Sequence, residues 1–228
     1  MGTSPFAQLT AEEAAELIPQ AAMVAFSGFT AAGAAKAVPK ALAARARRLH
    51  EAGRPFQISV LTGASTGPSL DDALAEADAI RWRAPYQSSG PLRKRINDGR
   101  VAFVDMHLSH LPQAALFGFF GPIDVAVIEA TEVTPDGRVY LTNSVGASPT
   151  FLQVARKVII ELNRFHYRKA SEMADIVVPK PPPYRNAIDL DHPLQRIGKT
   201  YARVDPEKVV GIVETASPDE LEIGRAHV

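Results

Sequence analysis

Three short loops rich in small residues contain the side chains whose type and spacing could do chemistry. They span residues 27–33, 62–68 and 142–146, and an apolar run precedes each of them. Backbone N–H groups in such loops bind anions or carbonyl oxygens. Gly28 and Gly33 lie five apart, as in a phosphate loop, but Ala34-Ala35 follows in place of Lys and Ser or Thr. The loops therefore predict an anion or carbonyl site that is not a nucleotide P-loop, or tight connections that bind nothing.

No catalytic triad is evident among the nucleophilic side chains. Ser65, Ser88 and Ser144 lie in small-residue loops, but none has the Gly-x-Ser-x-Gly setting of a nucleophile elbow. Turn and cap chemistry explains serines at such positions equally well. Glu129 and Glu132 follow an apolar run, and we expect both to pair at the surface or across a hairpin.

His107 and His110 are three residues apart, which on a helix could form a metal pair. There is no third ligand nearby and no His-Glu-x-x-His pattern. We therefore expect a buried or hydrogen-bonded histidine pair and no metal site. Arg196 follows an extended segment, and its planar fork suits a substrate carboxylate. A salt bridge to one of the nearby aspartates is the alternative for Arg196.

The elements that must position these groups alternate between strands and helices. Thr10 and Glu13 have capping-box spacing, which predicts a helix over 11–19. Apolar runs predict strands at 22–26, 56–61, 80–83, 101–105, 123–130, 139–141, 157–162 and 209–213. Helices are expected from about Pro39 to Gly53, after a cap at 69–72, over 89–97 and from 148 to about 156. This order predicts an α/β fold with a mostly parallel sheet, in which loops that follow strands meet at one edge.

Length and composition agree with a globular protein of one large α/β domain or two small ones. The chain has 228 residues and equal numbers of acidic and basic side chains, 25 of each, so no charge excess favours nucleic acid or an anionic membrane. It has no cysteine, which excludes disulfides and thiolate chemistry. No apolar run is long enough to span a bilayer, and the N-terminus has no targeting pattern. We expect a cytoplasmic protein with a polyproline-type connector near 179–183.

The ordered motifs resemble the acetyl-CoA hydrolase/transferase family, which includes CoA-transferases for succinyl-CoA:acetate, propionyl-CoA:succinate and 4-hydroxybutyrate. The resemblance begins at Ser27-Gly28-Phe29-Thr30 and Lys36-Ala37-Val38-Pro39, and it continues to about residue 220. Further matching motifs are Thr62-Gly63-Ala64-Ser65, Pro85-Tyr86-Gln87-Ser88, Asp105-Met106-His107-Leu108-Ser109-His110, the stretch 123–130, Ser144-Val145-Gly146-Ala147-Ser148-Pro149-Thr150, Arg196-Ile197-Gly198 and the stretch 209–215.

The resemblance implies a CoA-transferase-like N-terminal domain at 1–221. Members of the family have two similar α/β halves, and a glutamate in the second half forms a glutamyl-CoA thioester. No catalytic residue is then expected in this part. Residues that match positions facing a carboxylate substrate are Ser65, Ser88 and Arg196, with Gly28, Phe29 and Thr30 lining the same cleft. The implied substrates are an acyl-CoA thioester and a small carboxylate, with no tightly bound cofactor. The implied partners are the second half and further copies in a homo-oligomer.

The C-terminal residues 222–228 resemble a peptide encoded by a sequencing adapter, so we expect a non-native tail that packs on nothing. The alternative is a natural, divergent tail. A stand-alone, non-catalytic acyl-CoA-binding or assembly module is the rival function, and the sequence does not separate transferase from hydrolase. A sugar-phosphate isomerase of related fold would need a lysine-containing phosphate loop, which is not evident.

Overall fold

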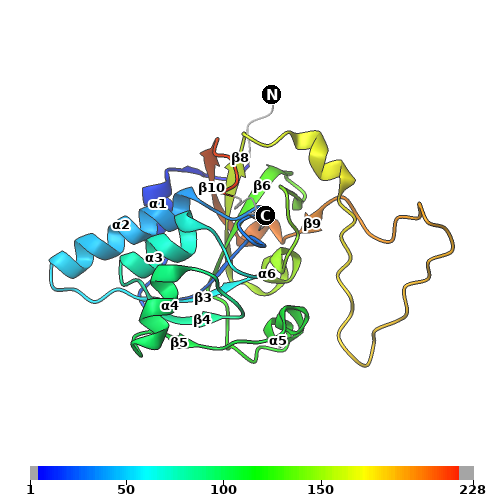
Figure 1. Ribbon diagram of the computed structural model, residues 1–228. Coiled ribbons are helices and arrows are strands. Elements are labelled where there is room, and N and C mark those ends of the chain that lie inside the picture. Colours follow the sequence, from blue (N-terminus) through cyan, green and yellow to red (C-terminus); the bar gives the residue numbers. More distant parts are fainter. Residues whose placement is uncertain (1–4, 221–228) are drawn as a thin grey trace, which may run out of the picture.

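The computed structural model describes residues 5–220, so the expected tail at 222–228 lies outside the described residues (Figure 1). A ten-stranded sheet lies at the centre, in the order β1-β10-β8-β6-β2-β3-β4-β5, and all pairs along this path are parallel. β7 pairs with β6 and β9 in the antiparallel sense. The predicted α/β fold with a mostly parallel sheet is confirmed.

The elements follow one another in the alternating order that the sequence predicts. The strands are β1 (Gln8–Leu9), β2 (Met23–Phe26), β3 (Ile58–Thr62), β4 (Ile80–Ala84), β5 (Ala102–Phe103), β6 (Val125–Val133), β7 (Arg138–Leu141), β8 (Lys157–Asn163), β9 (Ala202–Arg203) and β10 (Val209–Thr215). The α-helices are α1 (Ala11–Glu16), α2 (Ala37–Glu51), α3 (Ala73–Glu76), α4 (Gly90–Asn97), α5 (Leu111–Leu116) and α6 (Ser148–Val154). Short helical turns are η1 (Pro68–Asp72), η2 (Leu108–His110), η3 (Arg168–Met173) and η4 (Pro206–Lys208).

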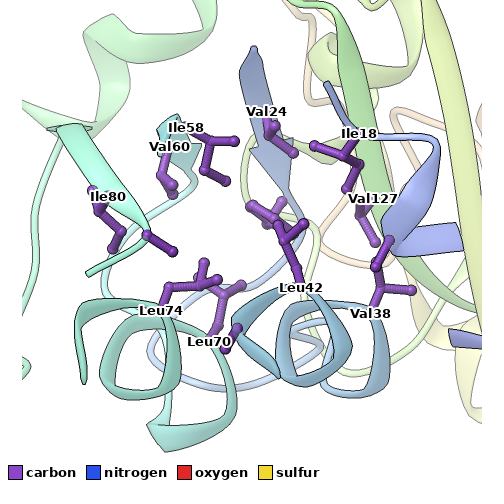
Figure 2. Packing of buried hydrophobic residues seen from close by; sticks show 14 of the residues in the cluster. Ile18, Val24, Val38, Leu42, Ile58, Val60, Leu70, Leu74, Ile80 and Val127 are labelled. Carbon is purple, nitrogen blue, oxygen red and sulfur yellow. The ribbon is translucent and has the colours of Figure 1, made fainter. Parts of the chain in front are cut away.

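Both faces of the sheet are covered, which explains why its strands are apolar throughout. Val24 and Phe26 of β2 belong to a cluster with helices α1 to α4, and Leu42 of α2 lies among them (Figure 2). Ala25, between them in β2, belongs to the cluster on the opposite face, where Phe151 of α6 packs. Alternate side chains of one strand therefore enter two cores, as the period of two requires.

Local signals fix several helix boundaries. Thr10 and Glu13 form the expected capping box, with bonds of 3.1 Å from Glu13 N to Thr10 Oγ1 and 2.8 Å from Thr10 N to Glu13 Oε2. Ser89 accepts a bond of 3.1 Å from the N–H of Leu92 and caps α4. The helix at 11–19 is shorter than predicted and ends at Glu16.

One predicted cap is wrong. We expected Ser69 to start a helix, but helical structure begins at Pro68, after Gly67. Proline suits the first helical turn because it has no N–H to satisfy there. Ser69 lies inside this turn, and its hydroxyl donates to Glu220 instead. Within residues 5–220, none of the helices combines the length and the apolar character that crossing a membrane requires.

Candidate active site

Four loops, residues 28–33, 62–68, 85–90 and 142–146, meet at the carboxyl edge of the sheet, as predicted from their places after strands or before helix starts. The glycines allow the backbones to touch: a Cβ atom on Gly63 would lie 2.8 Å from the carbonyl oxygen of Gly28 and 3.1 Å from the N of Ala147. It would also lie 3.2 Å from the Cα of Gly146. Any side chain at Gly63 would push these loops apart, so backbone contact sets their spacing.

A crevice of about 440 Å³ opens between three of these loops, 28–33, 62–68 and 85–90, and the loop 142–146 does not line it. Ser88 and Thr30 line it, whereas Ser65 is buried and its neighbour Thr66 reaches the lining. The lining also contains Ala31, Gly67, Pro68, Asp72, Ser89, Gly90 and Glu220. The crevice is therefore mostly polar, with hydroxyls from three loops.

The loop after β2 has an unusual backbone. Gly28, Thr30, Ala31 and Gly33 all have positive φ, at 124°, 52°, 67° and 62°. Phe29 and Ala32 exchange backbone hydrogen bonds of 3.0 and 3.1 Å, which closes a tight turn at Thr30 and Ala31. Positive φ at a residue with a side chain costs roughly 1–3 kcal/mol, and such strain concentrates at functional sites. The turn places Thr30 in the crevice lining.

A buried ion pair fixes the loop after β3. The guanidinium of Arg83 contacts Asp71 at 3.0 Å, and neither side chain is exposed. Arg83 also donates to the carbonyl of Ala64 at 3.1 Å, and Asp71 accepts from the N–H of Thr66 at 3.0 Å. Because both partners hold backbone atoms of the loop, the pair positions Ser65 and Thr66.

A second buried cluster centres on Lys36 and Glu129. The ammonium of Lys36 lies 2.6 Å from Glu129 Oε2 and donates to the carbonyl of Ala34 at 2.9 Å. Glu129 also accepts from Thr142 Oγ1 at 2.8 Å and from Asn163 Nδ2 at 3.0 Å. The expectation of surface or hairpin pairing is wrong for Glu129, which is 1% exposed. An acid inside an apolar strand of this sheet is buried, so it needs partners from other elements.

Opposing effects act on the pKa of Lys36. Burial lowers the pKa, but the carboxylates of Glu129 and Asp219 outweigh burial, so the pKa lies above 10.5. The ammonium therefore stays charged, as a buried cation beside two carboxylates should. Glu132, in contrast, pairs with Arg168 near the surface, as predicted for that acid.

Glu161 of β8 caps the N-terminus of helix α2, which packs on the face of the sheet where the Glu161 side chain lies. Its carboxylate accepts the N–H groups of Lys36, Ala37 and Val38 at 2.7, 2.9 and 3.1 Å. An anion at a helix N-terminus satisfies free N–H groups and complements the helix dipole. Burial nevertheless raises the pKa of Glu161; the three N–H bonds oppose this rise, and the nearby charge of Glu129 adds to it.

The segment after β10 crosses the same edge of the sheet. Asp219 accepts from Gly33 N at 3.2 Å and from Asn143 Nδ2 at 2.7 Å, and it lies 3.1 Å from Lys36 Nζ. Glu220 accepts from the N–H of Ser69 at 2.8 Å and enters the crevice lining. Residues 219 and 220 therefore tie the loops 28–33 and 142–146 to the turn η1, a role that no sequence pattern indicated.

The side chains of Glu129, His166 and Asp219 lie close enough together to bind a metal ion. Their ligand atoms lie within 4.8 Å of one another, and His166 Nε2 is 3.7 Å from both carboxylates. The Lys36 ammonium already contacts both carboxylates, so the chain supplies its own counterion there. Asn143 Nδ2 lies 3.2 Å from His166 Nδ1 and donates to Asp219, which favours a hydrogen on Nε2 rather than a free metal-binding lone pair.

The comparisons with known proteins assign the chain to a family. A sequence profile described as the acetyl-CoA hydrolase/transferase N-terminal domain matches residues 3–214. The chain belongs to the acetyl-CoA hydrolase/transferase family. The resemblance seen in its motifs is therefore confirmed.

Curated members of this family are longer than the chain. Propanoyl-CoA:succinate CoA transferase of Escherichia coli K12 is 55% identical over 212 residues, which cover 93% of this chain and 43% of that protein. Succinyl-CoA:acetate CoA-transferase of Clostridium kluyveri is 39% identical over 212 residues, with coverages of 93% and 39%. The acetyl-CoA hydrolase of Schizosaccharomyces pombe is 39% identical over 218 residues, with coverages of 92% and 42%. The chain spans about two fifths of the length of these relatives.

Solved structures share the fold. RipA from Yersinia pestis superposes with a TM-score of 0.67 at 23% identity, over 97% of this chain and 45% of that one. Glutaconate coenzyme A-transferase from Acidaminococcus fermentans gives a TM-score of 0.59 at 14% identity, over 91% of this chain and 75% of that one. At these identities the likeness shows the fold alone.

Two groups of residues singled out in the sequence lie apart from the crevice of this family member. Arg196 does not line it; its guanidinium donates to the carbonyls of Ala174 at 2.9 Å and Glu172 at 2.7 Å. Both partners are backbone carbonyls, so the alternative prediction, a salt bridge from Arg196 to an aspartate, is wrong. His107 and His110 are exposed rather than buried, and His107 Nδ1 lies 2.7 Å from Ser109 Oγ. The role of Arg196 toward a carboxylate remains a prediction.

Proposed function

We propose that residues 1–221 form the N-terminal half of an acyl-CoA:carboxylate CoA-transferase or an acyl-CoA hydrolase. Family membership over residues 3–214 is the observation that carries this proposal. The crevice at the carboxyl edge is the place where a small carboxylate and the acyl end of a CoA thioester would lie. No tightly bound cofactor is needed, because the thioester itself supplies the activated group.

The chain's own residues would bind and orient rather than react. The hydroxyl of Ser88 can donate to a carboxylate oxygen, whereas that of Thr30 already donates to the carbonyl of Phe29 at 2.7 Å and that of Thr66 is buried. Gly28 and Phe29, expected to line the cleft, lie behind the crevice lining rather than in it. Glu129 is a poor nucleophile here because Lys36, Thr142 and Asn163 hold its oxygens. In the reaction that the family resemblance implies, a glutamate of the second half takes CoA from the acyl-CoA and releases the acid. An acceptor carboxylate or water then resolves the glutamyl-CoA thioester.

A chimera tests this proposal. Residues 1–220 are joined to the part of the E. coli propanoyl-CoA:succinate CoA transferase that follows the matched region. We expect thioester transfer from propanoyl-CoA or succinyl-CoA by the chimera and none by residues 1–221 alone. Turnover by residues 1–221 that Glu129→Gln abolishes would refute the proposal. Tight acetyl-CoA binding by residues 1–221, measured by calorimetry, together with an inactive chimera would favour the rival binding module.

Arg196→Ala in that chimera tests the predicted carboxylate contact. Loss of a fork matched to a carboxylate should raise the KM of the acceptor acid about tenfold or more and change the KM of the acyl-CoA far less. Arg185→Ala is the matched control, because Arg185 is also exposed and also donates to a backbone carbonyl, that of Lys180. Equal effects of the two substitutions would show that Arg196 has no special part in acid recognition.

A further inference from the structure

A long arm, residues 177–197, extends from the body of the protein (Figure 1), and its first part, from Val178 to Arg185, lies beside α5 and α6. Every residue from 182 to 197 is exposed. Among them are large apolar side chains: Tyr184 is 71%, Leu190 68% and Leu194 86% exposed, and Ile188 is about half exposed. Soluble surfaces rarely gather so many large apolar groups without a partner that covers them.

The root of the arm is rigidly fastened. Ile176 and Lys199 exchange backbone hydrogen bonds of 2.8 and 3.0 Å, which joins the two ends of the arm. Asp175 accepts the N–H groups of Ile197 at 3.0 Å and Gly198 at 2.7 Å. Arg196 adds its two bonds to the backbone of residues 172 and 174. These bonds, from here on called the clamp, join both ends of the arm to the body and so fix the direction in which the arm leaves it.

The tip of the arm is already folded. Gln195 Oε1 accepts the N–H of Asp191 at 2.8 Å, and Gln195 Nε2 donates to the carbonyl of Asp189 at 3.2 Å. Gln195 N donates to the carbonyl of His192 at 2.9 Å. These bonds form a small turn that carries Leu190 and Leu194. A preformed tip loses little conformational entropy on binding, which favours a docking role over a disordered linker.

The segments on both sides of the arm lie by the carboxyl edge of the sheet: Ala202, which follows the arm, pairs with Val139 of β7, the strand that leads into the loop 142–146. The arm follows β8, and Asn163 at the end of β8 donates to Glu129. His166, three residues on, contacts Asn143 of the loop 142–146, which packs against the crevice loops at Gly28 and Gly63. A body that closed over the crevice would therefore meet the root of the arm. The matched region is 43% of the E. coli relative, so more than half of that protein remains to supply such a body.

We propose that the arm is the docking element for the polypeptide that follows the N-terminal domain in the longer members of the family. The inference rests on the proposed function, because it assumes that such a second body completes the crevice. Ile188, Leu190 and Leu194 would insert into an apolar groove on that body, and the clamp at Asp175 would hold the arm across the join.

Photo-crosslinking in the chimera described above tests this. p-Benzoylphenylalanine replaces Leu194 in one preparation and Phe119 in a matched control; Phe119 is 77% exposed and lies by Met23, at the opposite edge of the sheet. We expect peptide mass spectrometry to find crosslinks from position 194 to the relative-derived portion of the same polypeptide, and none from position 119. Amide exchange over 188–195 should slow about tenfold or more relative to the chain alone.

The outcomes of this experiment distinguish a failure of the docking proposal from a failure of the proposed function. Substituting Ile188→Ser, Leu190→Ser and Leu194→Ser should restore fast exchange over 188–195, while protected amides in β6 and β8 verify a folded sheet. An inactive chimera with the expected crosslink refutes the proposed function and leaves the arm's role standing. Crosslinks only between two copies, no crosslink, or unchanged exchange overturns the arm's role, whether or not the chimera is active.

Discussion

Removing the charge of Lys36 should destabilise the whole domain. Its ammonium is buried and contacts Glu129 at 2.6 Å and Asp219 at 3.1 Å. Lys36→Met keeps the length and apolar character of the side chain and removes the cation. Two carboxylates would then remain buried without their counterion, and the uncompensated charge is the main cost.

The size of the effect follows from the burial. Removing one partner of a buried pair costs about 3–5 kcal/mol. In a chain of this size 1 kcal/mol shifts Tm by about 2–4 °C, so we expect a drop of roughly 6–20 °C. Lys40→Met, in the first turns of α2, is the control: Lys40 is largely exposed and its pair with Glu220 spans 3.7 Å, so its loss should cost about 0–1 kcal/mol.

Thermal unfolding gives the Tm of both variants and urea unfolding gives their free energies, each followed by the fluorescence of Trp82, the single tryptophan. The raised pKa of Lys36 means that its contribution is fully present below pH 10.5 and is lost as pH rises through the folded-state pKa. The cost should therefore be constant between pH 6 and 9. Adding Glu129→Gln to Lys36→Met should recover part of the stability. A Lys36→Met variant as stable as Lys40→Met, or purely additive costs in the double variant, would refute this reasoning.

Three other predictions follow from single contacts. Burial raises the pKa of Glu161, so its contribution to the free energy of unfolding is present below pH 4.5 and is lost as pH rises through the folded-state pKa. In Glu161→Gln, the urea concentration at half-unfolding should therefore change less with pH above 4.5 than in the parent chain. Gly63→Ala should cost about 1–3 kcal/mol, because its Cβ meets backbone atoms, while Gly90→Ala, with open space around it, should leave the thermal midpoint almost unchanged. Thr10→Ala should cost about 1 kcal/mol by loss of the capping box, and a midpoint equal to that of the parent chain would contradict this.

The sequence predicted most of the strands, a mostly parallel sheet and the meeting of the loops because those features depend on local pattern. Apolar runs at 22–26 and 123–130 became β2 and β6, and the Thr10 cap lies where its spacing indicated. The two-residue strands β1 and β9 carry too few residues for any periodicity, so they could not be predicted.

The polar interior of the site depends on contacts between distant residues, and these were missed. Glu129 and Glu161 are register partners on neighbouring strands, and both interrupt apolar runs. That shared interruption was a usable signal, because a charge inside a buried strand requires a partner. Nothing local, however, links them to Lys36, or links Asp219 to Gly33, 186 residues earlier in the chain.

The spacing of the crevice loops is set by backbone contacts at glycines, independently of the side chains that line the crevice. Gly28, Gly63 and Gly146 approach one another through backbone atoms, so the distances between the loops do not depend on which side chains the loops display. Thr30, Thr66 and Ser88 can then be exchanged during evolution without moving the frame that carries them. Under the function proposed above, replacing one of these side chains would change which acid the crevice prefers and leave the spacing of its loops unchanged.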